Sequence, residues 1–251
     1  MSLFGNLKSD GLEESTDRLG GFQAWETGIY TGPIKVAYAG QSASGARYVT
    51  LIVDHDGKEY RETIYITNKA GENWFLNKET KKKVPLPGFT IIDDICLVTT
   101  GAALSDQEGE EKMVKVYDVD AKKELPKSVP VLTGLTGKIV SLAILKTLEN
   151  KSVKDTNGVY NDTAETRFSN NIDKVFHTET KMTVAEARNG AESGTFWGDW
   201  DKKNKGVDRD KRTIKDGSAG VAGKPGAARI QAGPPQAGSG YPARKSLFNA
   251  K

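Results

Sequence analysis

The sequence predicts a mainly β protein, a five-stranded Greek-key barrel with one short helix, peripheral additions and a flexible basic tail. Three observations predict this organisation. Segments of alternating apolar and polar residues recur from residue 28 onward, and a single helix-like segment interrupts them around residue 95. Residues 201–251 hold 12 Lys and Arg against 4 Asp and Glu, together with 8 Gly and 4 Pro. The chain is therefore predicted to consist of a strand-rich body followed by a basic tail rich in Gly and Pro.

The first three predicted strands form a meander. Residues 1–24 are polar with scattered apolar side chains, and we interpret them as an N-terminal arm. Strands are predicted at residues 34–38, 48–53 and 60–67, because apolar and polar side chains alternate in each of them. Asp56-Gly57 is a typical two-residue hairpin turn, so the second and third strands pair directly.

A helix and two further strands complete the predicted barrel. After an exposed connection at 73–87, Thr90 and Asp93 resemble a capping box, and Gly101 stands where the helix would end. Acidic residues 106–111 are predicted to form a loop, followed by strands at 113–119 and 138–145. Three strands, a helix and two strands is the element order of an OB-fold, a five-stranded Greek-key barrel.

The remaining segments extend this barrel, which is assigned to residues 25–150. Residues 151–200 are predicted to pack on it, with a strand at 168–176 and a short capped helix from Thr183 to Arg188. Residues 201–251 contain too few large apolar side chains to offset the entropy of ordering them. That tail carries net charge +8 against −5 for the first 200 residues, which indicates a polyanionic partner. Nucleic acid is our interpretation, with acidic polymerase surfaces or anionic membranes as alternatives.

Aromatic and basic side chains mark the outward face of the predicted strands. Aromatic rings stack on exposed bases and Lys or Arg contact phosphates, so this face is the predicted site for single-stranded nucleic acid. The other interpretation is that each aromatic packs against a cross-strand neighbour and the lysine triplet lies in a solvated loop. The predicted DNA-binding set is Lys35, Arg47, Tyr48, Arg61, Tyr65, Trp74, Phe75, Lys81, Lys82, Lys83, Lys115 and Tyr117.

Motifs for catalysis and metal binding are absent from the sequence. It has two His and one Cys, and no HExxH, CxxC, GxSxG or P-loop pattern. The run Asp54-His55-Asp56-Gly57 is explained as a turn, and Asp93-Asp94 as charge at a helix start. Cys96 lies in an apolar run, where a buried thiol in a reducing cytoplasm is expected. We expect no enzymatic activity, no cofactor and no membrane segment.

Residues 30–39, 47–67 and 73–76, followed by basic residues and Phe89, resemble the single-stranded-DNA-binding proteins of lytic tailed bacteriophages. The resemblance covers roughly residues 25–150. It implies an OB-fold that coats single-stranded DNA in the host cytoplasm during phage replication and recombination. The resemblance also implies binding without sequence preference and without a cofactor.

The C-terminus departs from the acidic tail of many such proteins, because its last nine residues include three Lys or Arg and no Asp or Glu. In this feature the chain resembles the single-stranded-DNA-binding protein of the podovirus branch, which also activates host RNA polymerase at late promoters through a basic C-terminal end. The resemblance implies a contact with that polymerase, or with a phage replication protein, through Lys245, Leu247, Phe248 and Lys251. A tail that binds DNA non-specifically is the alternative.

Two other functions remain open at this stage. A virion or assembly protein whose tail contacts packaged genome would bind duplex and single strands equally. An RNA-binding OB module would prefer RNA through its 2′-hydroxyl groups. Competition among oligonucleotides separates these possibilities from single-stranded DNA binding.

Overall fold

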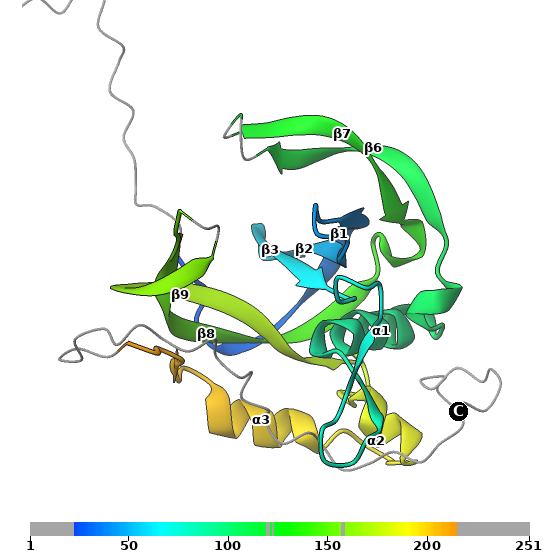
Figure 1. The fold of residues 1–251 in the computed structure, drawn as a ribbon. Coiled ribbons are helices and arrows are strands. Elements are labelled where there is room, and N and C mark those ends of the chain that lie inside the picture. The colour runs from blue at the N-terminus through cyan, green and yellow to red at the C-terminus, as the bar shows by residue number, and fades with distance from the viewer. Residues whose placement is uncertain (1–22, 119–120, 122, 157–158, 215–251) are drawn as a thin grey trace, which may run out of the picture.

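The computed structural model describes residues 23–118, 121, 123–156 and 159–214 (Figure 1). Its described part is mainly β, as the sequence predicts. Strands β1 (Gly28–Gln41), β2 (Arg47–His55) and β3 (Lys58–Tyr65) pair consecutively and antiparallel, which confirms the predicted meander. Asp56 and Gly57 form the turn between β2 and β3 with φ values of 51° and 77°. Positive φ at both positions is typical of a type I′ hairpin turn.

Strand β1 changes partner along its length and so bends the sheet. Its second half pairs with β2, and its first half, residues 28–33, pairs with β8 (Ile139–Lys154). A register shift between Ile34 and Val36 marks a bulge at the change of partner. Strand β8 pairs in turn with β9 (Tyr160–Phe176), so the continuous ladder runs β3-β2-β1-β8-β9.

The two ends of this ladder, β3 and β9, form no ladder with one another among the described residues. A side chain joins them instead. One carboxylate oxygen of Glu62, Oε2, accepts hydrogen bonds from the Tyr60 hydroxyl at 2.6 Å and from the Ile172 N–H at 3.0 Å. Burial raises the pKa of Glu62, while these two bonds act in the opposite direction. The expected closed five-stranded barrel is therefore not confirmed, because the sheet is open along this seam.

Helix α1 (Pro87–Thr100) packs its buried face on the core, with Ile92, Ile95 and Cys96 almost fully buried. It ends at Gly101, with φ of 73°, as predicted. Its start was predicted wrongly: Pro87 occupies the first turn, and the Thr90 hydroxyl donates to the Leu86 carbonyl instead of capping the helix. The buried Cys96 thiol is confirmed, and burial raises its pKa to about 12.

Asp93 and Asp94 therefore lie past the first turn of α1, so their interpretation as helix-start charge was wrong. The Asp93 carboxylate oxygen Oδ1 accepts the Leu104 N–H at 2.8 Å and holds the segment that follows the helix. Burial, with the neighbouring Asp93 charge, raises the pKa of Asp94 to about 7.

A long β-hairpin stands between α1 and β8. Strands β6 (Gly109–Asp118) and β7 (Lys123–Leu132) pair along their full length, and Figure 1 shows them reaching over β1, β2 and β3. The predicted loop at 106–111 is right only for Gln107 and Glu108, which connect a 3-10 turn at Leu104–Asp106 to β6; residues 109–111 already belong to the strand. The predicted fourth strand thus lies in this hairpin, and β8 and β9 continue the ladder from β1.

Two shorter features surround the core. Strands β4 (Trp74–Leu76) and β5 (Lys83–Pro85) form a separate small hairpin before α1. Helix α2 (Val184–Arg188) has the predicted capping box, in which Thr183 and Glu186 exchange hydrogen bonds.

Helix α3 (Phe196–Asn204) and β10 (Arg209–Asp210) correct the expected start of the tail at residue 201. Figure 1 shows α3 along the outside of β8, where Trp200 is buried and its indole N–H donates to Asp173 at 2.7 Å. Strand β10 pairs with β8, and Ile214 still contacts Asn150. Residues 201–214 thus belong to the packed body and not to a separate tail. The rest of the predicted tail and most of the predicted arm, residues 1–22, lie outside the described residues.

Candidate nucleic-acid interface

The outward face of β2 and β3 brings Tyr48 and Tyr65 together. They are direct cross-strand partners, and their ring centroids lie 5.6 Å apart at an interplanar angle of 67°. Gly40 on β1 provides room for the Tyr48 ring, because a Cβ at residue 40 would clash with it. Tyr65 is 52% exposed. The pair therefore presents aromatic surface to solvent on a rigid strand framework.

The basic residues predicted for this face are held by carboxylates. Arg61, four residues before Tyr65 and on the same face, lies 2.7 Å from Glu124 near the tip of the β6–β7 hairpin. Lys35 lies 2.6 Å from Glu59 on β3. Arg47 is exposed at the start of β2. These exposed pairs are worth little in water, so the Arg61 and Lys35 charges can exchange partners.

Lys115 and Tyr117 are exposed on β6, where they alternate with Val114 and Val116. The two valines pack against the cluster of Tyr38, Val129 and Val131 that anchors the hairpin. By strand alternation, Lys115 and Tyr117 lie on the opposite face of the hairpin. The structure consequently separates Tyr117 from the Tyr48–Tyr65 pair.

The β4–β5 hairpin carries the other predicted aromatic and lysine residues. Trp74 and Phe75 are half-buried, and the Lys83 ammonium lies 3.9 Å from the centre of the Trp74 ring. Lys81, Lys82 and Lys83 are exposed, with Lys81 at a positive φ of 55° beside the turn. The lysine triplet is thus an exposed connection, as the sequence indicates.

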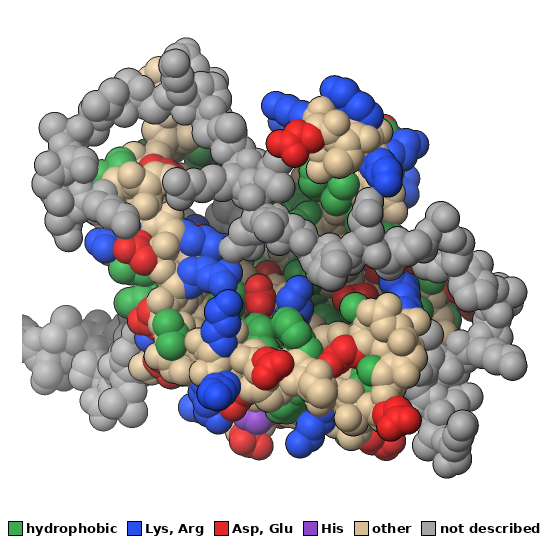
Figure 2. Space-filling view, turned by 90° about the horizontal axis from the view of Figure 1, so that it is seen from below, with side chains coloured by type: hydrophobic (Ala, Val, Ile, Leu, Met, Phe, Trp, Pro, Cys, Tyr) green, Lys and Arg blue, Asp and Glu red, His purple; other side chains and the backbone are tan. Residues whose placement is uncertain are grey.

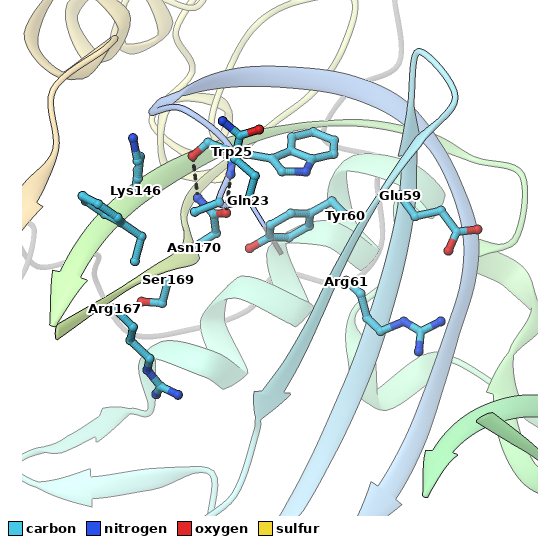
Figure 3. A pocket seen from close by; sticks show the side chains of 11 residues that line it. Gln23, Trp25, Glu59, Tyr60, Arg61, Lys146, Arg167, Ser169 and Asn170 are labelled. Carbon is cyan, nitrogen blue, oxygen red and sulfur yellow. Dashed lines mark hydrogen bonds between the residues drawn. The ribbon is translucent and has the colours of Figure 1, made fainter. Parts of the chain in front are cut away.

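A cleft opens along the seam between β3 and β9 (Figure 3). Its volume is about 690 Å³. Figure 3 shows Glu59 and Arg61 on β3, Arg167, Ser169 and Asn170 on β9, and Trp25 beside Tyr60 between them. The outward face of β3 leads from Tyr65 through Thr63 to Arg61, so the cleft continues the face that carries the tyrosine pair.

The segment before β1 is tied firmly to β9. The Trp25 N–H donates to the Asn170 side-chain oxygen at 2.8 Å, and the Asn170 amide donates back to the Trp25 carbonyl at 2.8 Å. The Trp25 ring contacts Tyr60 edge-on at 5.6 Å between centroids. This wall of the cleft is therefore preorganised.

The other wall of the cleft combines Lys146 on β8 with Phe168 on β9. The Lys146 ammonium lies 4.6 Å from the Phe168 ring centre and 2.8 Å from a Glu26 oxygen. The hydrogen bond to Glu26 is the main reason that the pKa of Lys146 is raised. Arg167 pairs with Glu149 at 2.9 Å. Basic, acidic and aromatic side chains thus alternate around the opening.

Charge on the surface is mixed rather than of one sign. In the view of Figure 2, Lys and Arg side chains gather in separate groups, with Asp and Glu side chains among them. Such a surface favours local contacts with phosphates over general attraction of a polyanion.

Sequence reasoning missed Trp25, Lys146, Arg167 and Phe168 as site residues. They come from three distant segments, and only the meeting of β8 and β9 with the start of β1 brings them together. The one usable signal was Phe168, an aromatic residue in a segment otherwise rich in polar side chains.

Several other expectations fall outside this surface. Lys245, Leu247, Phe248 and Lys251 lie outside the described residues. Within the described part of the chain, no group of three His, Cys, Asp or Glu side chains is arranged to hold a metal ion. Asp54 accepts the Gly57 N–H at 3.1 Å, consistent with its predicted turn role. None of the described helices has the length and apolar character that a bilayer crossing requires.

Comparison with known proteins finds no matching family model and no matching curated sequence.

Proposed function

We propose that this protein binds single-stranded DNA on the outward face of β2 and β3, without sequence preference. The observation that carries the proposal is the Tyr48–Tyr65 pair on the sheet, in which Tyr65 is exposed and Tyr48 half-buried, with Arg61 on the same face. Aromatic rings stack on any base, and cationic side chains follow the backbone, which is the chemistry of sequence-tolerant single-strand binding. No bond is made or broken in this activity.

The strand order supports an OB-fold as part of the proposal. With the β4–β5 and β6–β7 hairpins set aside, β1, β2, β3, α1, β8 and β9 follow in the order three strands, a helix and two strands. The predicted fourth strand lies in β6 and the predicted fifth in β8, so the fourth and fifth barrel strands of this proposal differ from the predicted ones. Their ladder β3-β2-β1-β8-β9 returns towards β3 at the seam bridged by Glu62. OB-folds are partly open barrels that bind oligonucleotides on the face of strands 2 and 3. The β6–β7 hairpin would then be an insertion between α1 and the fourth barrel strand.

The sequence resemblance to phage single-stranded-DNA-binding proteins suggests a biological role for this binding. We infer coating of DNA during phage replication and recombination in the host cytoplasm. Activation of host RNA polymerase through residues 245–251 is the further role that the resemblance suggests.

Replacing Tyr65 with Ala is expected to weaken single-stranded DNA binding by about 1–3 kcal/mol, the usual value of one base stack. The exposed position of Tyr65 leaves the fold unchanged. Fluorescence anisotropy with a labelled dT12 oligonucleotide measures the change, and Tyr65→Phe, which keeps the ring, should bind like the native protein. Equal affinity of the folded Tyr65→Ala variant would refute the assignment of this face. Equal binding of dT12 and duplex would favour a virion role, and preference for rU12 would favour RNA.

Glu124 forms an ion pair with the guanidinium of Arg61. Removing the charge of Glu124 is therefore expected to strengthen the binding of single-stranded DNA. Glu124→Gln frees Arg61 for a phosphate, so we expect a severalfold rise in dT12 affinity at low salt. A double-mutant cycle with Arg61→Met isolates this competition. If Glu124→Gln raises affinity equally in the Arg61→Met background, the effect is general repulsion and not release of Arg61.

A further inference from the structure

The cleft between β3 and β9 has the size and lining of a small-ligand site. Its volume of about 690 Å³ falls in the usual range for such sites. It exists because β3 and β9 are joined by the Glu62 carboxylate in place of a ladder of backbone hydrogen bonds. The seam is therefore closed at Glu62 and open beside it, where Arg61 and Ser169 line the cleft.

Two aromatic side chains offer flat apolar surface inside this cleft. Phe168 is 42% exposed although it projects from a paired strand, and Lys146 approaches its ring at 4.6 Å. Trp25 lines the cleft as well, held in place through its own backbone by Asn170. Figure 3 shows the Trp25 ring next to Tyr60, extending away from Asn170, and its ring contacts are with Tyr30, His55 and Tyr60.

The Ser169 hydroxyl does not face a ring stacked on Phe168. Ser169 pairs with Thr147 across the ladder, so its side chain lies on the face of β9 opposite Phe168. Both of these hydroxyl oxygens are buried without a hydrogen-bond partner among the described residues. The side chain of Asn170, on the same face as Phe168, is already engaged by Trp25. The cleft therefore offers a ligand a stacking surface.

The charges of the cleft favour a neutral ring over a phosphate. Lys146 lies 2.8 Å from Glu26 and 3.7 Å from Asp208, and Arg167 lies 2.9 Å from Glu149. The exposed Arg167–Glu149 pair can exchange partners as the Arg61 and Lys35 pairs can, whereas Lys146 is only 16% exposed and has two carboxylates, so it is less available to a phosphate. A neutral aromatic ring can instead stack on Phe168 without displacing an ion pair.

The cleft is also within reach of a strand bound at the tyrosine pair. Arg61 precedes Tyr65 by four residues on the same face of β3, a distance of about 13 Å at the usual rise of a strand. An extended single strand lying along β3 therefore passes from Tyr65 to the opening of the cleft.

We propose that this cleft holds one unpaired nucleobase of the bound strand, stacked against Phe168, with Trp25 in the other wall of the cleft. This proposal rests on the proposed function, because it needs a single strand on β3. Duplex DNA cannot deliver a base to the cleft, since its bases are paired and stacked. The cleft thereby selects single strands, while the outward face supplies phosphate contacts.

The test compares Phe168→Ala with Phe196→Ala, a second exposed phenylalanine on α3 outside the cleft. We measure binding of dT12, and of a 12-mer whose phosphodiester backbone carries no bases, at several salt concentrations. Phe168→Ala should bind dT12 about 5- to 150-fold more weakly than the native protein, with an unchanged salt slope. It should bind the abasic 12-mer as well as the native protein does, and Phe196→Ala should match the native protein on both.

Two further variants exclude misfolding and report on the cleft directly. Phe168→Leu retains apolar packing and loses the ring, so a folded Phe168→Leu variant should lose the same affinity. Trp25→Phe should remove most of the tryptophan quenching that dT12 produces, leaving the signals of Trp74, Trp197 and Trp200. Unchanged dT12 affinity in both Phe168 variants would overturn the base pocket. An equal loss with the abasic 12-mer would also overturn it, because the cleft would then contact the backbone.

The two proposals fail in different ways. If Tyr65→Ala weakens dT12 binding and neither Phe168 variant does, the outward face binds DNA and no base of the bound strand enters the cleft. If the native protein does not prefer dT12 over duplex, the proposed function itself fails.

Discussion

Ending the chain at Trp200 is expected to lower the free energy of unfolding by roughly 8 kcal/mol, at about 1 kcal/mol for each of the eight hydrogen bonds lost besides the β10 ladder. Residues 201–214 are tied to the body at three places. Gly206 and Val207 exchange hydrogen bonds with Thr27, β10 pairs with β8, and residues 213 and 214 bond to the side chain of Asn150. The same truncation removes the C-terminal half of α3 and leaves Trp200 at the chain end.

Ending the chain at Ile214 is the matched control, because it removes none of the contacts that the structure describes. Urea denaturation followed by circular dichroism compares the two truncations with the full chain. We expect the unfolding midpoint of the longer truncation to stay near that of the full chain. Equal stability of both truncations would mean that α3 and β10 contribute nothing to the fold, contrary to the buried position of Trp200.

Replacing Asp94 with Asn is expected to stabilise the protein at pH 8, by up to about 4 kcal/mol. The reason is that burial and the adjacent Asp93 charge raise the pKa of Asp94 from 3.8 to about 7, although Arg188 and Lys174 act in the opposite direction. One pKa unit corresponds to about 1.4 kcal/mol, so ionising this half-buried carboxyl opposes folding at high pH. Asn keeps the shape of the side chain and carries no charge.

The pH dependence has a definite sign. Between about pH 4 and pH 7 the folded protein holds a proton on Asp94 that the unfolded chain has lost. The stability of the native protein therefore falls as pH rises through this window, by up to about 1.4 kcal/mol per pH unit from this group. Asp94→Asn should lose that slope and match the native protein near pH 4.

Thermal unfolding at pH 4, 6 and 8 measures this effect. Asp106→Asn is the control, because Asp106 is an exposed aspartate that follows α1 closely in the chain. Its pH profile should follow that of the native protein. A profile for Asp94→Asn parallel to the native one would show that Asp94 ionises freely in the folded state.

The elements predicted correctly are those with strong local signals. The meander of β1, β2 and β3 follows from strict alternation, and its turn from the left-handed conformation that Asp56-Gly57 accepts readily. The end of α1 at Gly101 and the capping box of α2 depend on backbone groups within one turn of the residue concerned. Such features are decided by neighbours in the chain, so sequence alone predicts them.

The errors arise where distant partners decide the structure. Strand β7 carries Pro126 and Pro130, which argue against a central strand, and β6 begins among acidic residues. Both are strands because they pair with each other in a hairpin anchored on Tyr38. The segment after residue 200 is polar and rich in lysine, yet burial of Trp200 and pairing with β8 join residues 201–214 to the packed body.

The candidate site likewise has some features that follow from local sequence and others that depend on distant partners. By itself, the sequence determined that Tyr48, Arg61 and Tyr65 share one face, because period-two alternation is a property of the single strand. Only the tertiary structure decided that Tyr117 lies apart from them, that Arg61 meets Glu124, and that a cleft opens beside β3. The physical reason is that β1 bends and exchanges one partner strand for another. This bend brings β9 to β3, where a buried carboxylate joins the strands in place of a backbone ladder.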